Sequence, residues 1–411
     1  MIMTTSKDMY TYLKNKLKFK RIETIIVPTC KSDLLQNNKI EDDLQSMLRP
    51  LNFMQNILLY AKYSIRNNHI YCNTYFYNCF SLFSWFIYRC FSLIHLISVI
   101  KSAASGKKGW GEHSTRYFIF ASVVDYVIFV IGDLTRAFLN ITQSQHNVSL
   151  ILKIQHVLEA LQIDKFKLKY YVIFNWSFII FINSCFIVFF CFFVYTFDDV
   201  SVFDIFAGYI SINHDTNIMF TIFFLKLMTK MLRVWIKKVE NSRNLDNLAR
   251  NEDWDILFDV FANIQEAYTI LDKSCRLMIT YYTLFVSYLS LRNVSMVLCI
   301  RSFLDLQSRF IFLPVATQMW NMKNIAMVIL LAIECENFYA ALRDVESTCV
   351  MFIQARHRHD PNVCKNVLRV QRAMFHKMSA CGFFDVDAQL PLQLCSFLTS
   401  YTIVLLQFAY L

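Results

Sequence analysis

The chain has 411 residues, of which 56% are hydrophobic and only 18% are charged. A soluble domain usually carries about 25% charged residues, so this composition excludes an ordinary soluble enzyme and indicates an all-α membrane protein. The formal net charge of +10 does not point to nucleic acid, because the lysines and arginines stand in separate clusters between apolar runs.

Seven apolar runs have the length of about 20 residues that a helix needs to cross a bilayer. The predicted spans are 79–100, 117–139, 171–197, 217–236, 278–300, 318–339 and 390–411. The sixth is the least regular, since Asn321, Lys323 and Asn324 interrupt its apolar pattern. Residues 1–72 are expected to form a cytoplasmic N-terminal arm, and residues 73–411 a single membrane domain.

The basic residues predict the orientation, because lysine and arginine are retained on the cytoplasmic side of a membrane. Of the 41 lysines and arginines, 31 lie in the N-terminal arm, in the loops after the second, fourth and sixth spans, or at the inner end of the fourth span. The loop after the third span has no basic residue but four aspartates, Asp198, Asp199, Asp204 and Asp215. We therefore expect a cytoplasmic N-terminus and an extracellular C-terminus, the reverse of a G-protein-coupled receptor.

Cytoplasmic anchor helices are predicted at about 237–276 and 340–382. The first carries apolar residues at spacings of three and four, namely Leu257, Val260, Phe261, Ile264, Tyr268 and Leu271. In the second, a helix should start at Asp360, which can cap it, with Pro361 in the first turn, and end at Gly382. The second helix also carries an apolar stripe, which suits packing on other cytoplasmic helices or on a neighbouring subunit, and the sequence leaves these alternatives open: Val367, Leu368, Met374, Phe375 and Met378.

No enzyme, cofactor or metal site is expected. The 13 cysteines include no CxxC pair and are typical of small buried hydrophobic residues. The polar group from His357 to Asp360 favours a solvated turn over a metal site, since no further ligands accompany it. The 6 glycines form no phosphate-binding loop.

The last span is uncharged from Leu390 to Leu411, and Asp387 is placed to cap it. Bulky apolar residues recur along it at spacings of four, three, four and three: Phe397, Tyr401, Val404, Phe408 and Leu411. Such a face can form a hydrophobic constriction in a pore. Periodicity alone favours a stripe that faces lipid or the protein core instead.

The stretch Ser400–Phe408, SYTIVLLQF, resembles the signature of insect gustatory receptors, which is Thr-Tyr, five apolar positions and Gln-Phe. Ser400 replaces the threonine of the family and keeps its hydroxyl group. Residues 379–411, with CGFF at 381–384, resemble the family throughout, and LRPL at 48–51 resembles its N-terminal helix. Elsewhere the likeness is one of architecture only.

This resemblance implies a ligand-gated, non-selective cation channel in the plasma membrane of sensory neurons. Four copies of the pore helix, residues 388–411, would surround the pore, as a homotetramer or together with other gustatory receptors. The implied gate residues are Phe397, Tyr401, Val404, Gln407 and Phe408, of which Val404 and Phe408 match positions that close the pore. Expected partners are a small-molecule tastant and membrane lipid, without nucleic acid or a G protein.

In the family, the ligand binds in the outer half of the subunit, among spans two to six. The candidates there are Asp125, Tyr126, Gln318, Trp320 and Asn321. Asp125 is an intramembrane carboxylate, which is costly unless it is paired or hydrated. It can serve as a ligand contact or equally as a helix-to-helix hydrogen bond.

The sequence offers one hint about the ligand. Sugar receptors of the family usually have glutamate after the signature tyrosine, where this chain has Thr402. The pieces FFDVD at 383–387 and LPL at 390–392 resemble the moth and butterfly branch assigned to bitter plant compounds. Bitter compounds are therefore the leading hypothesis and fructose the alternative. A metabotropic receptor would need an extracellular N-terminus, and a secondary transporter would need an internal repeat, which we do not find.

Overall fold

The computed structural model describes residues 38–104, 112–163, 165–196, 202–242, 250–301, 312–354 and 361–410. The chain divides into two units, Met1–Lys39 and Ile40–Leu411. Most of the first unit, and with it much of the predicted N-terminal arm, lies outside the described residues. The fold and the sites below therefore belong to the second unit.

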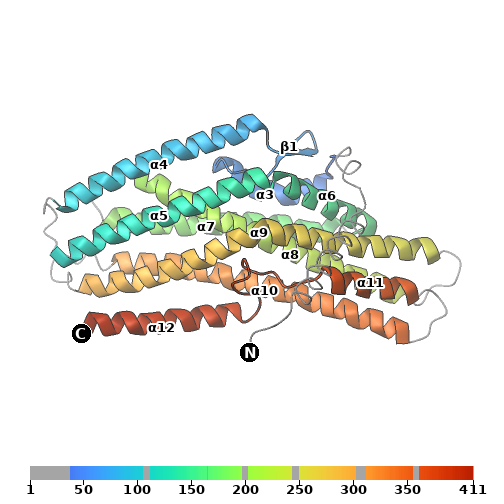
Figure 1. Cartoon of the computed structure of the whole chain (residues 1–411). Coiled ribbons are helices and arrows are strands. Elements are labelled where there is room, and N and C mark those ends of the chain that lie inside the picture. The colour runs from blue at the N-terminus through green and yellow to red at the C-terminus, as the bar shows by residue number, and fades with distance from the viewer. Residues whose placement is uncertain are drawn as a thin grey trace, which may run out of the picture. The chain divides into compact units, whose positions relative to one another are not determined.

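The second unit is mostly helical (Figure 1). Its elements in chain order are α3 (Asp42–Ile57), β1 (Ser64–Arg66), β2 (His69–Tyr71), α4 (Tyr75–Ala104), α5 (Glu112–Thr142), α6 (Ser144–Leu161), α7 (Lys165–Thr196), α8 (Val202–Ser242), α9 (Arg250–Arg301), α10 (Phe312–Gln354), α11 (Pro361–Met374) and α12 (Leu390–Tyr410).

Among the described residues, 4 helices contain a segment long and apolar enough to cross a membrane. The segments are Tyr75–Ser98 in α4, Lys169–Tyr195 in α7, Val315–Gln354 in α10 and Leu390–Gln407 in α12. They coincide with the first, third, sixth and seventh predicted spans, so the irregular sixth run is one of them. The other three predicted spans lie in α5, α8 and α9. The chain is thus a mostly helical protein with apolar helices suited to a membrane.

Two predicted spans are parts of longer helices than the sequence indicated. Helix α9 combines the first anchor helix with the fifth span, and α10 continues the sixth span as far as Gln354. Helix α8 begins at Val202, so Asp204 and Asp215 are helical rather than part of an extracellular loop, and Asp215 is buried. The predicted apolar stripe of the first anchor helix, from Leu257 to Leu271, is buried.

The second anchor was predicted to stay helical to Gly382, but α11 ends at Met374. The chain then folds back on itself: the Val386 amide donates to the Met378 carbonyl at 2.8 Å, and the Ala380 amide donates to the Phe384 carbonyl at 2.9 Å. Cys381 and Gly382 adopt left-handed φ angles of 52° and 80°, which no helix allows. Pro361 does begin α11, as predicted, whereas Asp360 lies outside the described residues.

Two local elements were not predicted. Helix α6 lies where only a cytoplasmic loop was expected, and it buries the apolar residues Leu150, Ile151, Ile154, Val157 and Leu158 on one side. Strands β1 and β2 form an antiparallel hairpin. Its turn residues Asn67 and Asn68 have φ angles of 50° and 61°, which asparagine tolerates in a tight hairpin turn.

The largest core surrounds the middle and C-terminal part of α8, which α9 and α10 cover. Trp235 of α8 is fully buried there, and its indole N–H donates to the Leu257 carbonyl of α9 at 2.7 Å. Helix α3, which carries the LRPL sequence, packs on α7 and α8. Asn175 of α7 donates to the Met47 carbonyl of α3 at 2.8 Å, and this bond fixes α3 to the helical bundle.

Candidate functional site

Helix α12, the predicted pore helix, has mostly exposed side chains. Leu390 and Leu394 are buried against the rest of the subunit, where α12 contacts α9 and α10. Phe397, Tyr401 and Val404 are 42%, 50% and 42% exposed, and the rings of Phe397 and Tyr401 lie 4.5 Å apart. An apolar helix exposed to this extent needs lipid or another protein surface around it.

Of the two remaining predicted gate residues, the structure describes the side chain of Gln407 but not that of Phe408. Gln407 is exposed, as a side chain facing a pore or a neighbouring subunit would be. Phe408 belongs to α12, but its side chain lies outside the described residues, as does all of Leu411. The structure thus brings Phe397, Tyr401 and Val404 to the exposed part of one helix.

The start of α12 is attached to α10 through the segment after α11. The Tyr339 hydroxyl of α10 accepts a hydrogen bond from the Met378 amide at 2.8 Å and donates to the Val386 carbonyl at 3.1 Å. Asp387 caps α12 as predicted: its carboxylate accepts from the Gln389 amide at 2.9 Å.

Lys377 and Asp387 form an ion pair beside this cap, with 2.7 Å between Nζ and Oδ2. The hydrogen bond from Lys377 lowers the pKa of Asp387, and the same bond raises the pKa of Lys377. Further along, His376 contacts the buried Asp272 of α9, with 3.1 Å between Nε2 and Oδ2. The contact between His376 and Asp272 thus connects the segment before α12 to α9.

Two of the predicted ligand residues lie on α5. Asp125 pairs with Arg292 of α9 at 2.9 Å and accepts a hydrogen bond from the Tyr288 hydroxyl at 2.6 Å. The Tyr126 hydroxyl donates to the Arg89 carbonyl of α4 at 3.3 Å. The helix-to-helix hydrogen bond that the sequence left open for Asp125 is therefore present.

The other three lie on α10. Asn321 is buried and accepts a hydrogen bond from the Ser290 hydroxyl of α9 at 3.0 Å. The Trp320 ring is half-buried, 5.3 Å from the ring of Phe189 and 3.7 Å from Nζ of Lys323. Gln318 is exposed.

These two groups contact different sides of α9. Asp125 reaches Tyr288 and Arg292, one helical turn apart, while Asn321 reaches Ser290, which points about 200° away from Tyr288. The structure thus separates the α5 candidates from the α10 candidates instead of gathering the five around one cavity.

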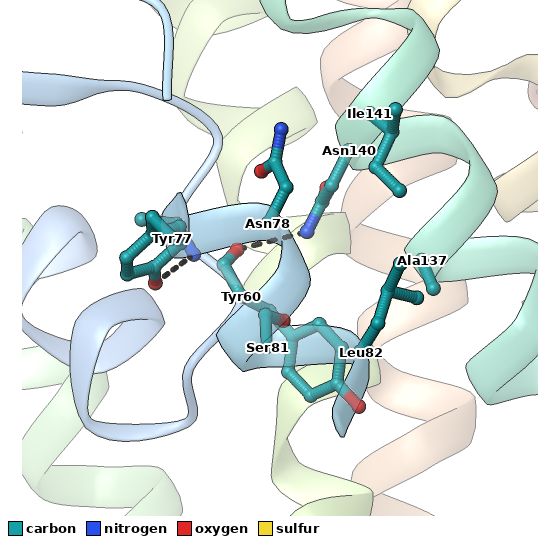
Figure 2. Close-up of a pocket in the computed structure, with 9 residues that line it drawn as sticks. Tyr60, Tyr77, Asn78, Ser81, Leu82, Ala137, Asn140 and Ile141 are labelled. Atoms are coloured by element: carbon teal, nitrogen blue, oxygen red, sulfur yellow. Dashed lines mark hydrogen bonds between the residues drawn. The ribbon is translucent and has the colours of Figure 1, made fainter. Parts of the chain in front are cut away.

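A small polar cavity lies elsewhere, between the start of α4 and the end of α5 (Figure 2). It holds about 10 Å³, room for roughly one water molecule. The Asn140 amide donates to the Tyr60 carbonyl at 3.0 Å, and the Tyr77 hydroxyl accepts from the Ala61 amide at 3.1 Å, as Figure 2 shows. Its size suits hydration, not a tastant.

The sequence places Asp125 and Lys323 in predicted spans without indicating a partner for either. In the structure, Asp133 of α5 bridges Arg89 of α4 and Arg136 of α5. Asp215 of α8 pairs with Lys323 of α10. A charged residue within an apolar run does indicate an ion pair, since intramembrane charges almost always pair with one another. The sequence does not identify the partner, because the paired residues are far apart in the chain.

The fold and these ion pairs define a class: a helical protein with apolar helices suited to a membrane and paired charges in its interior. Comparison with known proteins gives no matching protein-family model and no matching curated sequence. The functional argument therefore rests on the residues of this chain.

Proposed function

We propose that this chain is a gustatory receptor subunit that acts as a ligand-gated, non-selective cation channel in the plasma membrane of sensory neurons. The observation that carries the proposal is the signature SYTIVLLQF at 400–408 on an apolar helix that is largely exposed. A helix that lined a pore would be largely exposed in a single subunit, because its other surfaces would face neighbouring copies and the ion path.

The proposed arrangement has seven spans, carried by α4, α5, α7, α8, α9, α10 and α12, with a cytoplasmic N-terminus and an extracellular C-terminus. The asymmetry of lysine and arginine among the loops supports this orientation. Four copies of α12 would form the pore, in a homotetramer or together with related receptors. Exposed Phe397, Tyr401 and Val404 would then narrow it, and Gln407 would supply a polar group near the gate.

For the ligand, we propose bitter plant compounds, with fructose as the alternative within the same family. Thr402 supports this choice, because it stands where sugar receptors usually have glutamate. Tyr288 and Arg292 accompany Asp125 at the α5–α9 contact. A basic nitrogen of an alkaloid would compete with the Arg292 guanidinium for that carboxylate, and the Tyr288 ring would suit the alkaloid's ring system.

Electrophysiology tests the channel. Cells that express this chain alone are exposed to a panel of bitter alkaloids and to fructose, and excised outside-out patches are recorded without GTP or ATP. We expect a ligand-evoked cation current that persists in the excised patch. A response that exists only in intact cells, through second messengers, would contradict the channel and favour a metabotropic receptor.

Topology needs a separate test. Asn140 and Asn147 lie in glycosylation sequons, but both are buried, so their unmodified state does not reveal the side of the membrane. A sequon on a flexible tag is therefore added after Leu411 in one variant and before Met1 in another. We expect glycosylation of the C-terminal tag only, whereas modification of the N-terminal tag would reverse the proposed orientation.

A further inference from the structure

A buried charge imbalance lies where α4 meets α5. Asp133 pairs through one carboxylate oxygen with Arg89 and through the other with Arg136. The side chain of Arg89 is 9% exposed, that of Arg136 is 1% exposed and that of Asp133 is fully buried. Two guanidinium groups therefore share one carboxylate, and within the described part of the chain one positive charge is left without a compensating negative charge.

Several N–H groups of these arginines have no hydrogen-bond partner among the described residues. They are Nε of Arg89, and Nε and Nη1 of Arg136. The face of the Arg136 guanidinium rests on the Tyr60 ring at 3.8 Å, which covers the plane of the group but leaves its N–H edge unsatisfied. An unpaired buried donor costs about 1–3 kcal/mol, and more where it is charged.

His214 of α8 is a third unsatisfied group in this region. It is 1% exposed, and neither ring nitrogen has a hydrogen-bond partner among the described residues. Its ring lies 5.0 Å from that of Tyr281 on α9. The Tyr281 phenol packs against Gly132 of α5, which immediately precedes Asp133. The charges of Arg136 and Arg89 act on the His214 ring, as does that of Lys323 on α10. Through Tyr281 and Gly132, His214 is thus linked to the part of α5 that carries Asp133 and Arg136.

The other carboxylates of the interior do not supply the missing charge. Asp215 is taken by Lys323 and by the Tyr282 hydroxyl, which donates to it at 2.7 Å. Asp125 is taken by Arg292 and Tyr288. Each of these centres is balanced by itself. Water could satisfy N–H groups around Arg136, but it would leave the excess positive charge uncompensated.

We propose that a small monovalent anion of the halide class, chloride in a cell, binds between Arg136, Arg89 and His214 and neutralises this cluster. The two guanidinium groups would supply charge-assisted hydrogen bonds, and the imidazole N–H would supply a neutral one. The anion would connect α4, α5 and α8, beside Tyr281 of α9. This site is separate from the pore and from the proposed tastant contacts, and it does not depend on channel activity.

Thermal unfolding of the purified full-length protein in detergent tests the site. Chloride replaces gluconate at constant ionic strength, and bromide and nitrate are titrated in the same way. We expect Tm to rise with ln(1 + [L]/Kd), by about 3 °C or more once chloride is well above Kd, because the anion binds only the folded state. The same Tm in every salt, or a rise that is linear in salt concentration and equal for gluconate and the halides, would overturn the proposal.

Variants assign the effect to the cluster. Arg136→Gln removes the excess charge and should abolish the chloride-dependent rise in Tm, and Arg89→Gln should do the same if Arg136→Gln does not fold. Asp133→Asn increases the charge imbalance and should lower the apparent Kd for chloride about tenfold. Arg343→Gln is the matched control, since Arg343 is 62% exposed and paired with Glu336 at the surface. A halide response that survives both arginine substitutions would also overturn the site.

Discussion

Asp215 of α8 and Lys323 of α10 form an ion pair in which the side chains are only 2% and 4% exposed. The pair joins two long helices whose contact residues are more than a hundred positions apart, at 215 and 323. Tyr282 of α9 completes the carboxylate's hydrogen bonds, and the ammonium group lies over the Trp320 ring at 3.7 Å. This contact therefore holds α8, α9 and α10 in register.

Replacing Lys323 by methionine should lower the free energy of unfolding by about 3–5 kcal/mol, because it leaves the Asp215 carboxylate buried without a cation. Thermal unfolding in detergent measures the loss. The double variant Asp215→Leu with Lys323→Met should recover much of it, since no buried charge then remains. The exposed pair of Arg343 and Glu336 is the control, and Arg343→Met should cost about 1 kcal/mol or less. Equal losses for the two lysine and arginine variants would contradict the buried pair.

The sequence predicted the helices better than their contacts. Apolar periodicity located the Leu257 to Leu271 stripe correctly, because burial of one helix face leaves a local pattern. Asp215 was expected in a loop, since a carboxylate beside an apolar run looks like its solvated end. Its partner Lys323 lies in another helix, and no local pattern indicates that pairing.

The end of α11 shows the same limit. Gly382 was a reasonable stop signal, but the helix ends at Met374, since Met378 and Val386 form a backbone hydrogen bond across a turn that Tyr339 holds.

The sequence did predict that α12 needs an apolar environment, because the run is uncharged, and the structure shows the helix largely exposed. The separation of Asp125 from Asn321 by α9 was not predicted, since it depends on how three helices pack.

Gly132 permits the close approach of α5 to α9. A Cβ atom at this position would overlap the Tyr281 phenol, so Gly132→Ala should destabilise the protein by about 1–3 kcal/mol. Thermal unfolding of the purified variant measures this cost. Adding Tyr281→Val should make the combined cost less than the sum of the single costs, whereas Tyr281→Phe should give no such relief because its ring remains. Strict additivity with valine would contradict the contact.

The cap and ion pair of Asp387 can be separated by substitution. Asp387→Asn keeps an N-cap side chain and loses the charge, while Asp387→Ala loses both, so alanine should cost about 1 kcal/mol more than asparagine. Unfolding of the two variants under identical conditions measures the difference. Equal costs would mean that the cap contributes nothing.

The same pair predicts a pH dependence. The lowered pKa of Asp387 contributes stability that is present above its ordinary range and is lost as the pH falls through the lowered value. The raised pKa of Lys377 contributes stability that is lost only as the pH rises through the raised value. Between about pH 6 and 9 the wild type and Asp387→Asn should therefore differ by a constant Tm offset. An offset that changes within this interval would implicate another titrating group.

The proposed gate predicts a constitutive current. Val404→Ser replaces an exposed apolar group on α12 by a polar one, and a hydrated constriction should conduct without ligand. We expect a leak current several-fold above that of the wild type, measured in cells with matched surface expression. Leu392→Ser is the matched control, because Leu392 is 72% exposed near the start of the same helix but lies outside the stripe. A leak with Leu392→Ser and none with Val404→Ser would place the ion path on a different side of α12, and no leak with either would remove Val404 from the gate.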